Sequence, residues 1–205
     1  MKLLFIEARK KLKQEELLSL KKNINEIRKL GSIHILYSIQ YKELAELIRK
    51  KIRSQVKAFQ QVLGCSKIKP KASLLLIGSG KFHALQLAMQ TGKEVYIYNN
   101  CISKITQEEI DKEKKREKGK ILRFLNEKNI GIIVSLKPGQ FQMNKALKLK
   151  EKLESKGKNA FIFLCDNISI SEIENFSCFF INTACPGISL DSDNLVNYES
   201  ISYIL

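Results

Sequence analysis

Two cysteines are the best candidates for chemistry in this chain, because each is next to a residue that shapes a turn. Cys65 follows Gly64 in the segment Gln-Gln-Val-Leu-Gly-Cys-Ser, and Cys185 precedes Pro186 in the segment Ile-Asn-Thr-Ala-Cys-Pro-Gly-Ile. Glycine exposes the backbone and proline fixes a turn, so both neighbours suit loops that bind metal clusters through thiolates. Taken alone, each cysteine would more often be structural.

The other three cysteines have weaker contexts. Cys101 follows two asparagines in a predicted loop and stays ambiguous, whereas Cys165 and Cys178 stand in apolar strand segments, where cysteine usually packs as a small hydrophobic residue. An odd number of cysteines without close spacing argues against a disulfide framework. The lack of a CxxC motif removes the usual evidence for zinc ribbons, thioredoxins and ordinary radical enzymes that use S-adenosylmethionine.

A glycine-containing turn follows one short apolar segment and opens a predicted helix. It consists of Gly78, Ser79, Gly80, Lys81, Phe82 and His83. Backbone N–H groups at a helix start bind anions, and His83 could act in acid–base chemistry or hydrogen bonding. The turn matches neither the P-loop nor the dinucleotide-binding motif, so a simple strand-to-helix turn is an equal alternative. The other histidine, His34, lies within a predicted strand, where histidine is usually a core residue.

A second turn, Lys137-Pro138-Gly139-Gln140, ends another apolar segment. A cation and an amide at the carboxyl end of a strand suit a carboxylate or phosphate ligand. The alternative is a proline turn with a solvated lysine.

The elements that must position these segments alternate between strand and helix. The predicted strands are residues 2–7, 33–39, 73–77, 94–98, 131–136, 160–164 and 179–183. The predicted helices are residues 13–30, 41–59, 83–90, 106–129, 140–156 and 171–176. This pattern predicts an α/β fold with right-handed crossovers and mainly parallel sheets. We expect two consecutive Rossmann-like units, residues 1–105 and 106–205, with the polar helix at the boundary.

Composition and charge narrow the class of protein. The chain has 205 residues, 44% of them hydrophobic and 28% charged, as in soluble globular proteins. No apolar run reaches the ~20 residues that span a bilayer, and the N-terminus becomes charged too early for a signal peptide. We therefore expect a cytoplasmic protein that does not bind membranes.

The net charge of +15 is concentrated in residues 1–71, which hold 18 Lys and Arg against 6 Glu. A basic half could attract nucleic acid or an acidic protein. Solvated lysine-rich helices are the favoured alternative, because basic residues do not interleave with aromatic ones and no helix-turn-helix or RNA-binding signature is present.

Five segments, taken in order, resemble the diphthamide synthases of the first biosynthetic step, the 2-(3-amino-3-carboxypropyl)histidine synthases. They are residues 61–65, 78–85, 131–140, 146–152 and 182–191. The resemblance covers about residues 2 to 195, and Ile39-Gln40 also fits it. It implies a protein with three similar α/β domains, in which each domain gives one cysteine to a 4Fe–4S cluster. Such proteins work as homo- or heterodimers. The cluster would reduce S-adenosylmethionine to a 3-amino-3-carboxypropyl radical, which is added to a histidine of elongation factor 2.

Carried over by motif, Cys65 matches the second cluster cysteine and Cys185 the third, so the two units match the middle and C-terminal domains of the family. The resemblance also makes the two turns candidates for binding S-adenosylmethionine. Their candidate residues are Gly78, Gly80, Phe82, His83, Lys137, Gly139 and Gln140.

The sequence departs from the family pattern in two respects. The N-terminal domain with the first cluster cysteine has no counterpart, and Gly187 stands where arginine usually follows the Cys-Pro pair. We therefore expect a truncated form, a subunit of a split enzyme whose missing domain and thiolate come from a separate chain. The alternatives are that Cys101 substitutes, that a homodimer forms, or that the chain is a non-catalytic accessory subunit or a module that binds elongation factor 2.

Overall fold

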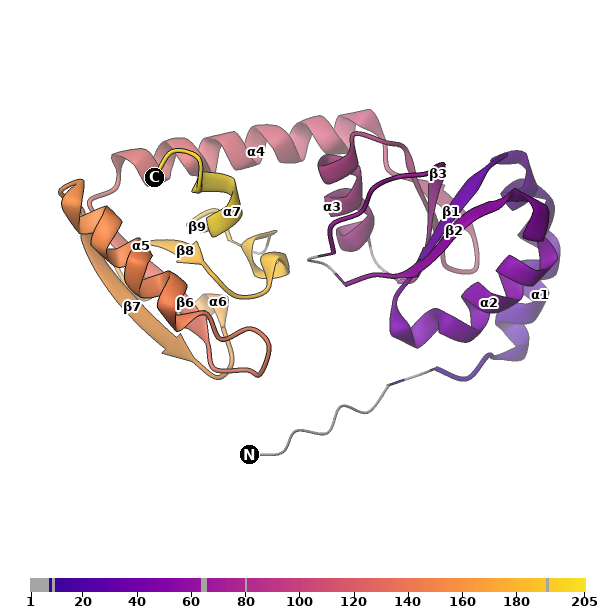
Figure 1. The fold of residues 1–205 in the computed structure, drawn as a ribbon, viewed down its shortest axis with the longest axis horizontal. Coiled ribbons are helices and arrows are strands. Elements are labelled where there is room, and N and C mark those ends of the chain that lie inside the picture. Colours follow the sequence, from indigo (N-terminus) through magenta and orange to yellow (C-terminus); the bar gives the residue numbers. More distant parts are fainter. Residues whose placement is uncertain (1–7, 9, 64–65, 80, 191) are drawn as a thin grey trace. The chain divides into compact units, whose positions relative to one another are not determined.

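The computed structural model of the chain describes residue 8 and residues 10–63, 66–79, 81–190 and 192–205. The chain divides into two compact units, Met1–Asp111 and Lys112–Leu205, here called unit 1 and unit 2. The division falls inside helix α4 (Gln107–Asn126), a few residues after the expected boundary. Each unit has its own sheet with helices packed on it (Figure 1). The strand predicted at residues 2–7 lies outside the described residues.

The sheet of unit 1 has five strands in the order β2-β1-β3-β4-β5. They are β1 (Ile33–Tyr37), β2 (Val56–Gln61), β3 (Ser73–Ile77), β4 (Val95–Tyr98) and β5 (Ile102–Lys104). The first four are mutually parallel, and β5 returns antiparallel to β4 as a short hairpin. The parallel strands therefore end at the same edge of the sheet, where open α/β sheets bind ligands.

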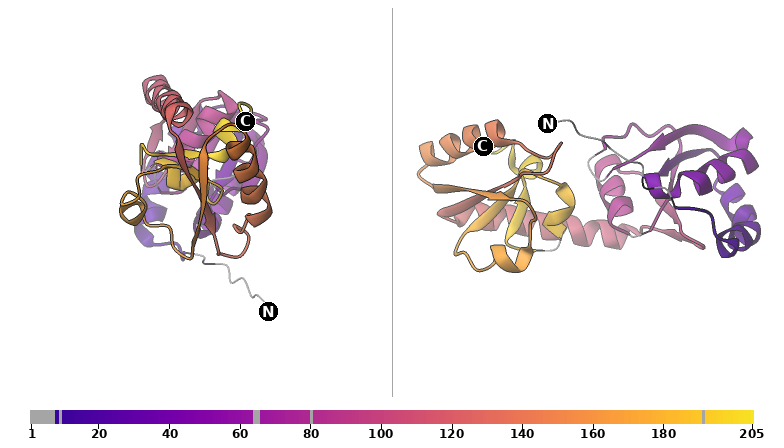
Figure 2. Two further views of the ribbon diagram at one scale, coloured as in Figure 1. Left: turned by 90° about the vertical axis from the view of Figure 1, so that its left-hand side faces the viewer. Right: turned by 90° about the horizontal axis from the view of Figure 1, so that it is seen from below.

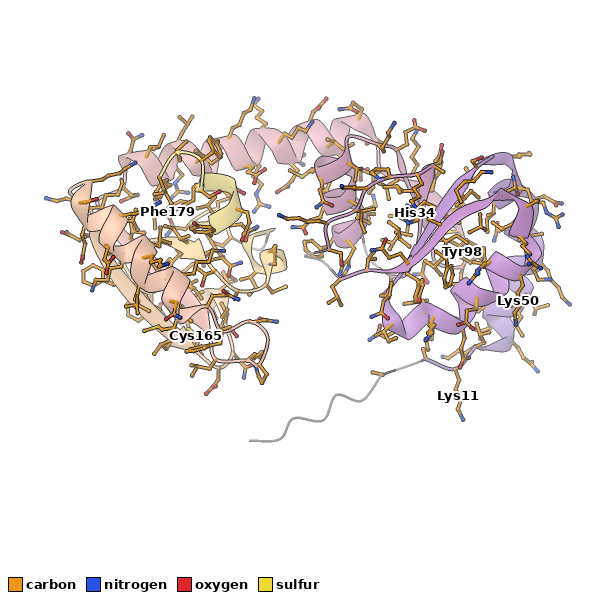
Figure 3. All side chains as sticks on the ribbon, viewed as in Figure 1. Lys11, His34, Lys50, Tyr98, Cys165 and Phe179 are labelled. Atoms are coloured by element: carbon orange, nitrogen blue, oxygen red, sulfur yellow. The ribbon has the colours of Figure 1, made fainter. Side chains whose placement is uncertain are left out.

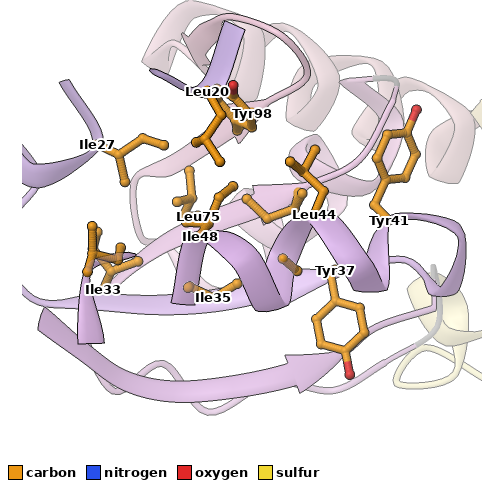
Figure 4. Packing of buried hydrophobic residues seen from close by; sticks show 13 residues of the cluster. Leu20, Ile27, Ile33, Ile35, Tyr37, Tyr41, Leu44, Ile48, Leu75 and Tyr98 are labelled. Atoms are coloured by element: carbon orange, nitrogen blue, oxygen red, sulfur yellow. The ribbon is translucent and has the colours of Figure 1, made fainter. Parts of the chain in front are cut away.

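Helices cover both faces of this sheet, because successive side chains of a strand point to opposite sides. On one face, Ile33 and Ile35 of β1 pack with residues of α1 (Gln14–Lys29) and α2 (Lys42–Lys51) in a fully buried cluster (Figure 4). On the other, Leu36 packs with α3 (Lys81–Thr91). Burying each such aliphatic side chain contributes roughly 1.5–3 kcal/mol. One-turn 3-10 helices at Ile39–Tyr41 and Arg53–Gln55 flank α2.

The helix predicted at residues 41–59 is wrong in its second half. Helix α2 ends at Lys51, and residues 56–61 form the edge strand β2, in which Phe59 is in register with Ile35 of β1. The apolar face of α2 continues by chance into Val56 at helical spacing, which hid the change of element. Pairing with β1 decides the outcome, since β-branched and aromatic residues fit a half-buried strand.

The sheet of unit 2 is wholly parallel, with the order β7-β6-β8-β9. Its strands are β6 (Asn129–Ser135), β7 (Asn159–Cys165), β8 (Phe179–Asn182) and β9 (Leu195–Asn197). Strand β9 has only three residues and was not predicted from the sequence. Figure 2 shows two further views of both sheets. As in unit 1, the carboxyl ends of the strands lie at one edge.

The two faces of this sheet are covered unequally. One face packs against α4, α5 (Met143–Ser155) and α7 (Tyr198–Ile201) in a cluster that includes Phe124, Leu153 and Phe179. On the other, the four-residue helix α6 (Ile170–Ile173) packs in a smaller cluster. The edge strand β7 leaves Phe161 50% and Leu164 52% exposed.

A glycine in the middle strand allows aromatic rings to cross this second face. A Cβ atom at Gly131 would lie 2.3 Å from the ring of Phe180 and 3.0 Å from the ring of Phe163. These two rings meet edge-to-face with their centroids 5.3 Å apart. Only glycine fits at this position without displacing Phe180.

Charged side chains and the buried core are distributed as expected for an α/β protein. Figure 3 shows Lys11 and Lys50 projecting outward from unit 1, while His34 lies within it. Among the helices that the structure describes, none is long and apolar enough to cross a membrane. The predicted fold class, α/β with mainly parallel sheets, is confirmed.

Candidate functional site

The candidate site segments follow the carboxyl ends of strands within each unit. In unit 1, β2 precedes Cys65, β3 precedes the Gly78 turn and β4 precedes Cys101. In unit 2, β6 precedes the Lys137 turn and β8 precedes Cys185. The Gly78, Lys137 and Cys185 segments thus follow strands that the sequence predicted, whereas β2, the strand before Cys65, was predicted as helix.

Cys185 lies on a loop that is anchored to the central strands of unit 2. The residue after β8, Thr183, is buried, and its backbone N–H and Oγ1 both donate to the carbonyl of Ile133 in β6, at 3.2 and 2.7 Å. After Cys185 the chain forms a 3-10 helix, Pro186–Leu190, in which the N–H of Ile188 donates to the Cys185 carbonyl at 3.2 Å. The cysteine is free and half-buried. Its thiol is therefore available at the surface of a fixed loop.

Two asparagines bind the backbone on either side of this cysteine. Asn182 and Asn197 are in register on the parallel strands β8 and β9. The Nδ2 of Asn182 donates to the Cys185 carbonyl at 2.7 Å and to Oδ1 of Asn197 at 2.8 Å, and its Oδ1 accepts from the N–H of Ala184 at 2.9 Å. The Nδ2 of Asn197 donates to the Pro186 carbonyl at 3.1 Å.

A buried lysine continues this network. Asn197 also donates to Oγ of Ser189 at 2.7 Å, and Lys120 of α4 donates to the Ser189 carbonyl. The Lys120 side chain is buried, and burial lowers its pKa, with a further contribution from the like charge of Arg116. Helix α4 thus holds the far end of the Cys185 loop with a cation.

The Lys137 turn follows β6, the strand next to β8. Gly139 has a φ of +81°, and the N–H of Gln140 donates to the Lys137 carbonyl at 3.0 Å. A positive φ is the conformation that glycine adopts without strain. The Lys137 side chain is exposed and Gln140 is half-buried. Because the neighbouring strands β6 and β8 are parallel, this turn and the Cys185 loop lie at the same edge of the unit 2 sheet.

The Gly78 turn of unit 1 is close to two strands. The N–H of Gly78 donates to the carbonyl of Tyr98 at the end of β4, at 3.3 Å, and a Cβ atom at Gly78 would meet Oγ of Ser38 at 3.5 Å. Gly78 is buried, and its backbone links the end of β3 to the end of β4. Gly80 lies outside the described residues.

The side chains that follow this turn have partners within unit 1. Phe82 and His83 are half-buried, with their rings edge-to-face and 5.0 Å apart, and burial lowers the pKa of His83. Lys81 forms an ion pair with Glu109 at 2.8 Å. A neutral imidazole is therefore favoured at the start of α3, where it can donate or accept a hydrogen bond.

Cys65 lies outside the described residues, so the structure gives no geometry for it. The described residues on either side, Leu63 and Ser66, are joined by two hydrogen bonds, from Leu63 N–H to Ser66 Oγ at 2.8 Å and from Ser66 N–H to the Leu63 carbonyl at 3.0 Å. Cys101 is exposed in the β4–β5 hairpin, beside Asn100 with its φ of +62°.

Of the remaining cysteines, Cys165 ends β7 and Cys178 precedes β8. Both are half-buried, and burial raises the pKa of each thiol, which favours the protonated form. In the part of the chain that the structure describes, no three His, Cys, Asp or Glu side chains gather closely enough to hold a metal ion. Cys185, a free thiol on an anchored loop, has the donor chemistry of one cluster ligand.

The residues that anchor the Cys185 loop were not predicted from the sequence; they are Asn182, Asn197 and Lys120. Asn182 and Asn197 each end an apolar strand, and this was the available signal. It could not be used because β9 was not predicted, so the two asparagines could not be placed in register. A lysine within a highly charged helix carries no sign of burial.

Comparison with known proteins gives consistent matches. A family model described as "Putative diphthamide synthesis protein" matches residues 1–200. A 2-(3-amino-3-carboxypropyl)histidine synthase of Methanocaldococcus jannaschii is 34% identical over 202 residues, which cover 93% of this chain and 56% of that protein. The enzyme of the same name from Pyrococcus horikoshii is 30% identical over 193 residues, covering 84% and 56%. The chain thus spans just over half the length of these relatives.

Solved structures show the same similarity in three dimensions. The crystal structure of Dph2 from Pyrococcus horikoshii matches with a TM-score of 0.77 and 25% identity, over 92% of this chain and 61% of that one. A second crystal structure of that protein, with a 4Fe–4S cluster, matches with a TM-score of 0.74 over the same shares.

Proposed function

The chain belongs to the diphthamide synthesis protein family, and on this basis we propose that it is a subunit of a 3-amino-3-carboxypropyl transferase. The proposed reaction transfers the 3-amino-3-carboxypropyl group of S-adenosylmethionine to a histidine of elongation factor 2, in the cytoplasm. The relatives it matches are diphthamide biosynthesis enzymes, and a solved neighbour binds a 4Fe–4S cluster. That this chain takes part in the same chemistry is our proposal.

The observation that carries the proposal is the position of Cys185. It is a free, half-buried thiol directly after a central strand of the unit 2 sheet, on a loop whose backbone is fixed by hydrogen bonds. Cys165 and Cys178 are half-buried as well, but Cys165 ends the edge strand β7 and Cys178 precedes β8. Only Cys185 among these three lies on a loop that follows the carboxyl end of a central strand, where open α/β sheets bind ligands. Cys185 therefore has the surroundings of a ligand.

We propose that Cys185 and Cys65 each give one thiolate to a 4Fe–4S cluster. When bound, the cluster would supply the electron that cleaves S-adenosylmethionine to a carbon radical. A third thiolate would come from a separate chain, from a second copy of this chain, or from Cys101. Exposure of Cys101 at the carboxyl end of β4 is compatible with this last option.

The two turns are proposed to bind S-adenosylmethionine. The exposed ammonium group of Lys137 suits the carboxylate of the methionine part. In unit 1, the ring of His83 is held edge-on against Phe82 and kept neutral by burial, so it can hydrogen-bond an uncharged part of the ligand. The backbone of Gly78, Gly80, Gly139 and Gln140 would shape the two turns around it.

An accessory subunit without chemistry is the alternative function. Gly187 after the Cys-Pro pair favours it, because glycine removes the cation that the family resemblance leads one to expect there. A pull-down of elongation factor 2 or of a catalytic subunit that survives the combined substitution Cys65→Ser and Cys185→Ser would support this alternative.

Anaerobic iron–sulfur reconstitution tests the proposed function, with the chain alone and mixed with candidate partner chains. We expect a reduced 4Fe–4S signal by EPR that changes when S-adenosylmethionine is added. The substitution Cys185→Ser should remove the signal, whereas Cys178→Ser, at a half-buried cysteine outside the proposed ligand set, should retain it. The proposal fails if no partner yields Fe–S absorption, or if the cluster survives the loss of both Cys65 and Cys185.

A further inference from the structure

We propose that Asn182 and Asn197 are positioning residues that hold the Cys185 loop in its ligand-binding conformation. This inference rests on the proposed function, because it assumes that the Cys185 thiol binds the cluster. It concerns residues that do not themselves touch a ligand. Their role is to fix the backbone from which the thiol projects.

The first argument is that one amide brackets the cysteine. Asn182 accepts a hydrogen bond from the N–H of Ala184 at 2.9 Å and donates one to the carbonyl of Cys185 at 2.7 Å. The same side chain therefore binds the Thr183–Ala184 peptide group before Cys185 and the Cys185–Pro186 peptide group after it. Rotation of the loop about Cys185 would break at least one of these bonds.

The second argument concerns burial. Asn182 is only 1% exposed, and a buried amide without partners is costly. Its remaining N–H is satisfied by Oδ1 of Asn197, its register partner on β9. The loop conformation is thus the one in which this amide keeps its partners, and any other conformation leaves a buried polar group unpaired.

The third argument is that the network continues past the cysteine. Asn197 binds the Pro186 carbonyl and the Ser189 hydroxyl, and Ser189 Oγ donates to the Pro186 carbonyl at 3.0 Å. Lys120 binds the Ser189 carbonyl. The backbone of the loop is held at the carbonyls of Cys185, Pro186 and Ser189, while Cys185 itself is free and half-buried. Hydrogen-bonded supports of this kind orient metal ligands and are costly to remove.

The chain offers a matched control in the same unit. Asn194 Nδ2 donates to the Cys178 carbonyl at 2.8 Å, so it also binds the backbone of a half-buried cysteine from a distant position in the sequence. Cys178 is not a proposed ligand. Replacement of Asn194 removes a similar hydrogen bond without touching the Cys185 loop.

The experiment compares Asn182→Asp with Asn194→Asp. Aspartate keeps the oxygen that accepts from Ala184 but loses the N–H donors. In the metal-free chain, we expect hydrogen exchange at the Ile188 amide, which donates to the Cys185 carbonyl, to become about tenfold faster in Asn182→Asp only. In the reconstituted protein, loss of the cluster to a chelator should also be about tenfold faster in that variant alone. Asn197→Ala should act in the same direction, and it covers the case in which Asn182→Asp does not fold.

The outcomes separate this inference from the proposed function. If Asn182→Asp and Asn197→Ala leave exchange at Ile188 unchanged, or if Asn194→Asp changes it equally, the positioning role is wrong. If the wild-type chain forms no cluster with any partner, the proposed function fails. In that case, faster exchange at the Ile188 amide in the two variants still supports the role of the asparagines in fixing the loop. Unchanged exchange overturns that role.

Discussion

His34 differs from the other buried polar side chains because neither of its ring nitrogens has a hydrogen-bond partner among the described residues. The asparagines and the threonine around Cys185 are fully paired, as buried polar groups usually are. His34 lies on β1 with 2% of its surface exposed. Its neutral ring is therefore tolerated in the core, whereas a charged ring would not be.

This arrangement predicts a loss of stability in acid. Burial lowers the pKa of His34, and the like charge of Lys71 lowers it further. The unfolded chain takes up a proton near the ordinary pKa of about 6.5, and the folded chain only at lower pH. The contribution of the neutral His34 ring to the free energy of unfolding is therefore complete above about pH 6.5. As the pH decreases from there, this contribution decreases by at most about 1.4 kcal/mol per pH unit.

Urea unfolding at several pH values checks this prediction. His34→Leu should be stabilised relative to the wild type by an amount that grows as the pH falls from 7 to 5. His83, whose pKa is also lowered by burial, remains in both proteins and contributes equally. If the free energies of unfolding of the two proteins changed equally with pH, His34 would not be the cause of the loss of stability in acid.

Gly131 predicts a second effect of a single residue. Gly131→Ala places a Cβ atom against the ring of Phe180, and overpacking of this kind costs about 1–3 kcal/mol. Gly119, in helix α4, has no atom within 4 Å of the position of an added Cβ, so Gly119→Ala should stabilise the helix by roughly 0.5–1 kcal/mol. Thermal unfolding of both variants measures the difference. Equal effects of the two substitutions would contradict the account of the aromatic contact.

At the scale of elements, the C-terminus of α4 is held by a lysine from another part of the chain. Lys158 Nζ donates to the carbonyls of Phe124, Leu125 and Glu127, at 3.1, 2.9 and 2.5 Å. The last carbonyls of a helix have no partner within the helix, and a cation also favours this end of the helix dipole. The ammonium group therefore serves as a cap from outside the helix.

We expect Lys158→Met to lower the free energy of unfolding by about 1–2 kcal/mol, because hydrogen bonds from a charged donor are stronger than neutral ones. Lys152→Met, at an exposed lysine in the last turn of α5, is the control and should change stability little. Chemical denaturation measures both. If the two variants were equally stable, the cap would contribute nothing.

How far the sequence predicts the elements depends on length and pairing. The long helices and the apolar parallel strands follow from periodicity, and they lie close to their predicted positions. The periodicity predicts helix in place of strand β2 because Val56 continues the spacing of α2, and β9 is too short to show a pattern. Both depend on pairing with a distant strand, which local sequence does not encode.

The candidate site was predictable only in part, for the same reason. Cysteine and glycine next to turns are visible in sequence, so Cys185 and the Lys137 turn were placed correctly at strand ends. The asparagine network was not, because it requires the register of β8 and β9. The proposed roles of the site residues remain predictions, and Cys65 lies outside the described residues.

At the scale of the whole molecule, each hydrophobic cluster draws its members from one unit only. Gly131→Ala should therefore reduce hydrogen-exchange protection in unit 2, for example at Ile132, and leave amides such as Ile35 of unit 1 unchanged. Exchange measured by mass spectrometry on the full chain tests this. Equal loss of protection in both units would show that they unfold as one.

Strand β7 has a practical consequence for handling the protein. It lies at the edge of its sheet, it contains neither a charged residue nor proline, and it exposes Phe161 and Leu164. Natural edge strands usually carry charged residues or proline, which discourage pairing with other chains. Colloidal stability at high concentration should therefore be limited by this strand despite the net charge of +15, and Phe161→Lys should raise the concentration at which light scattering first increases.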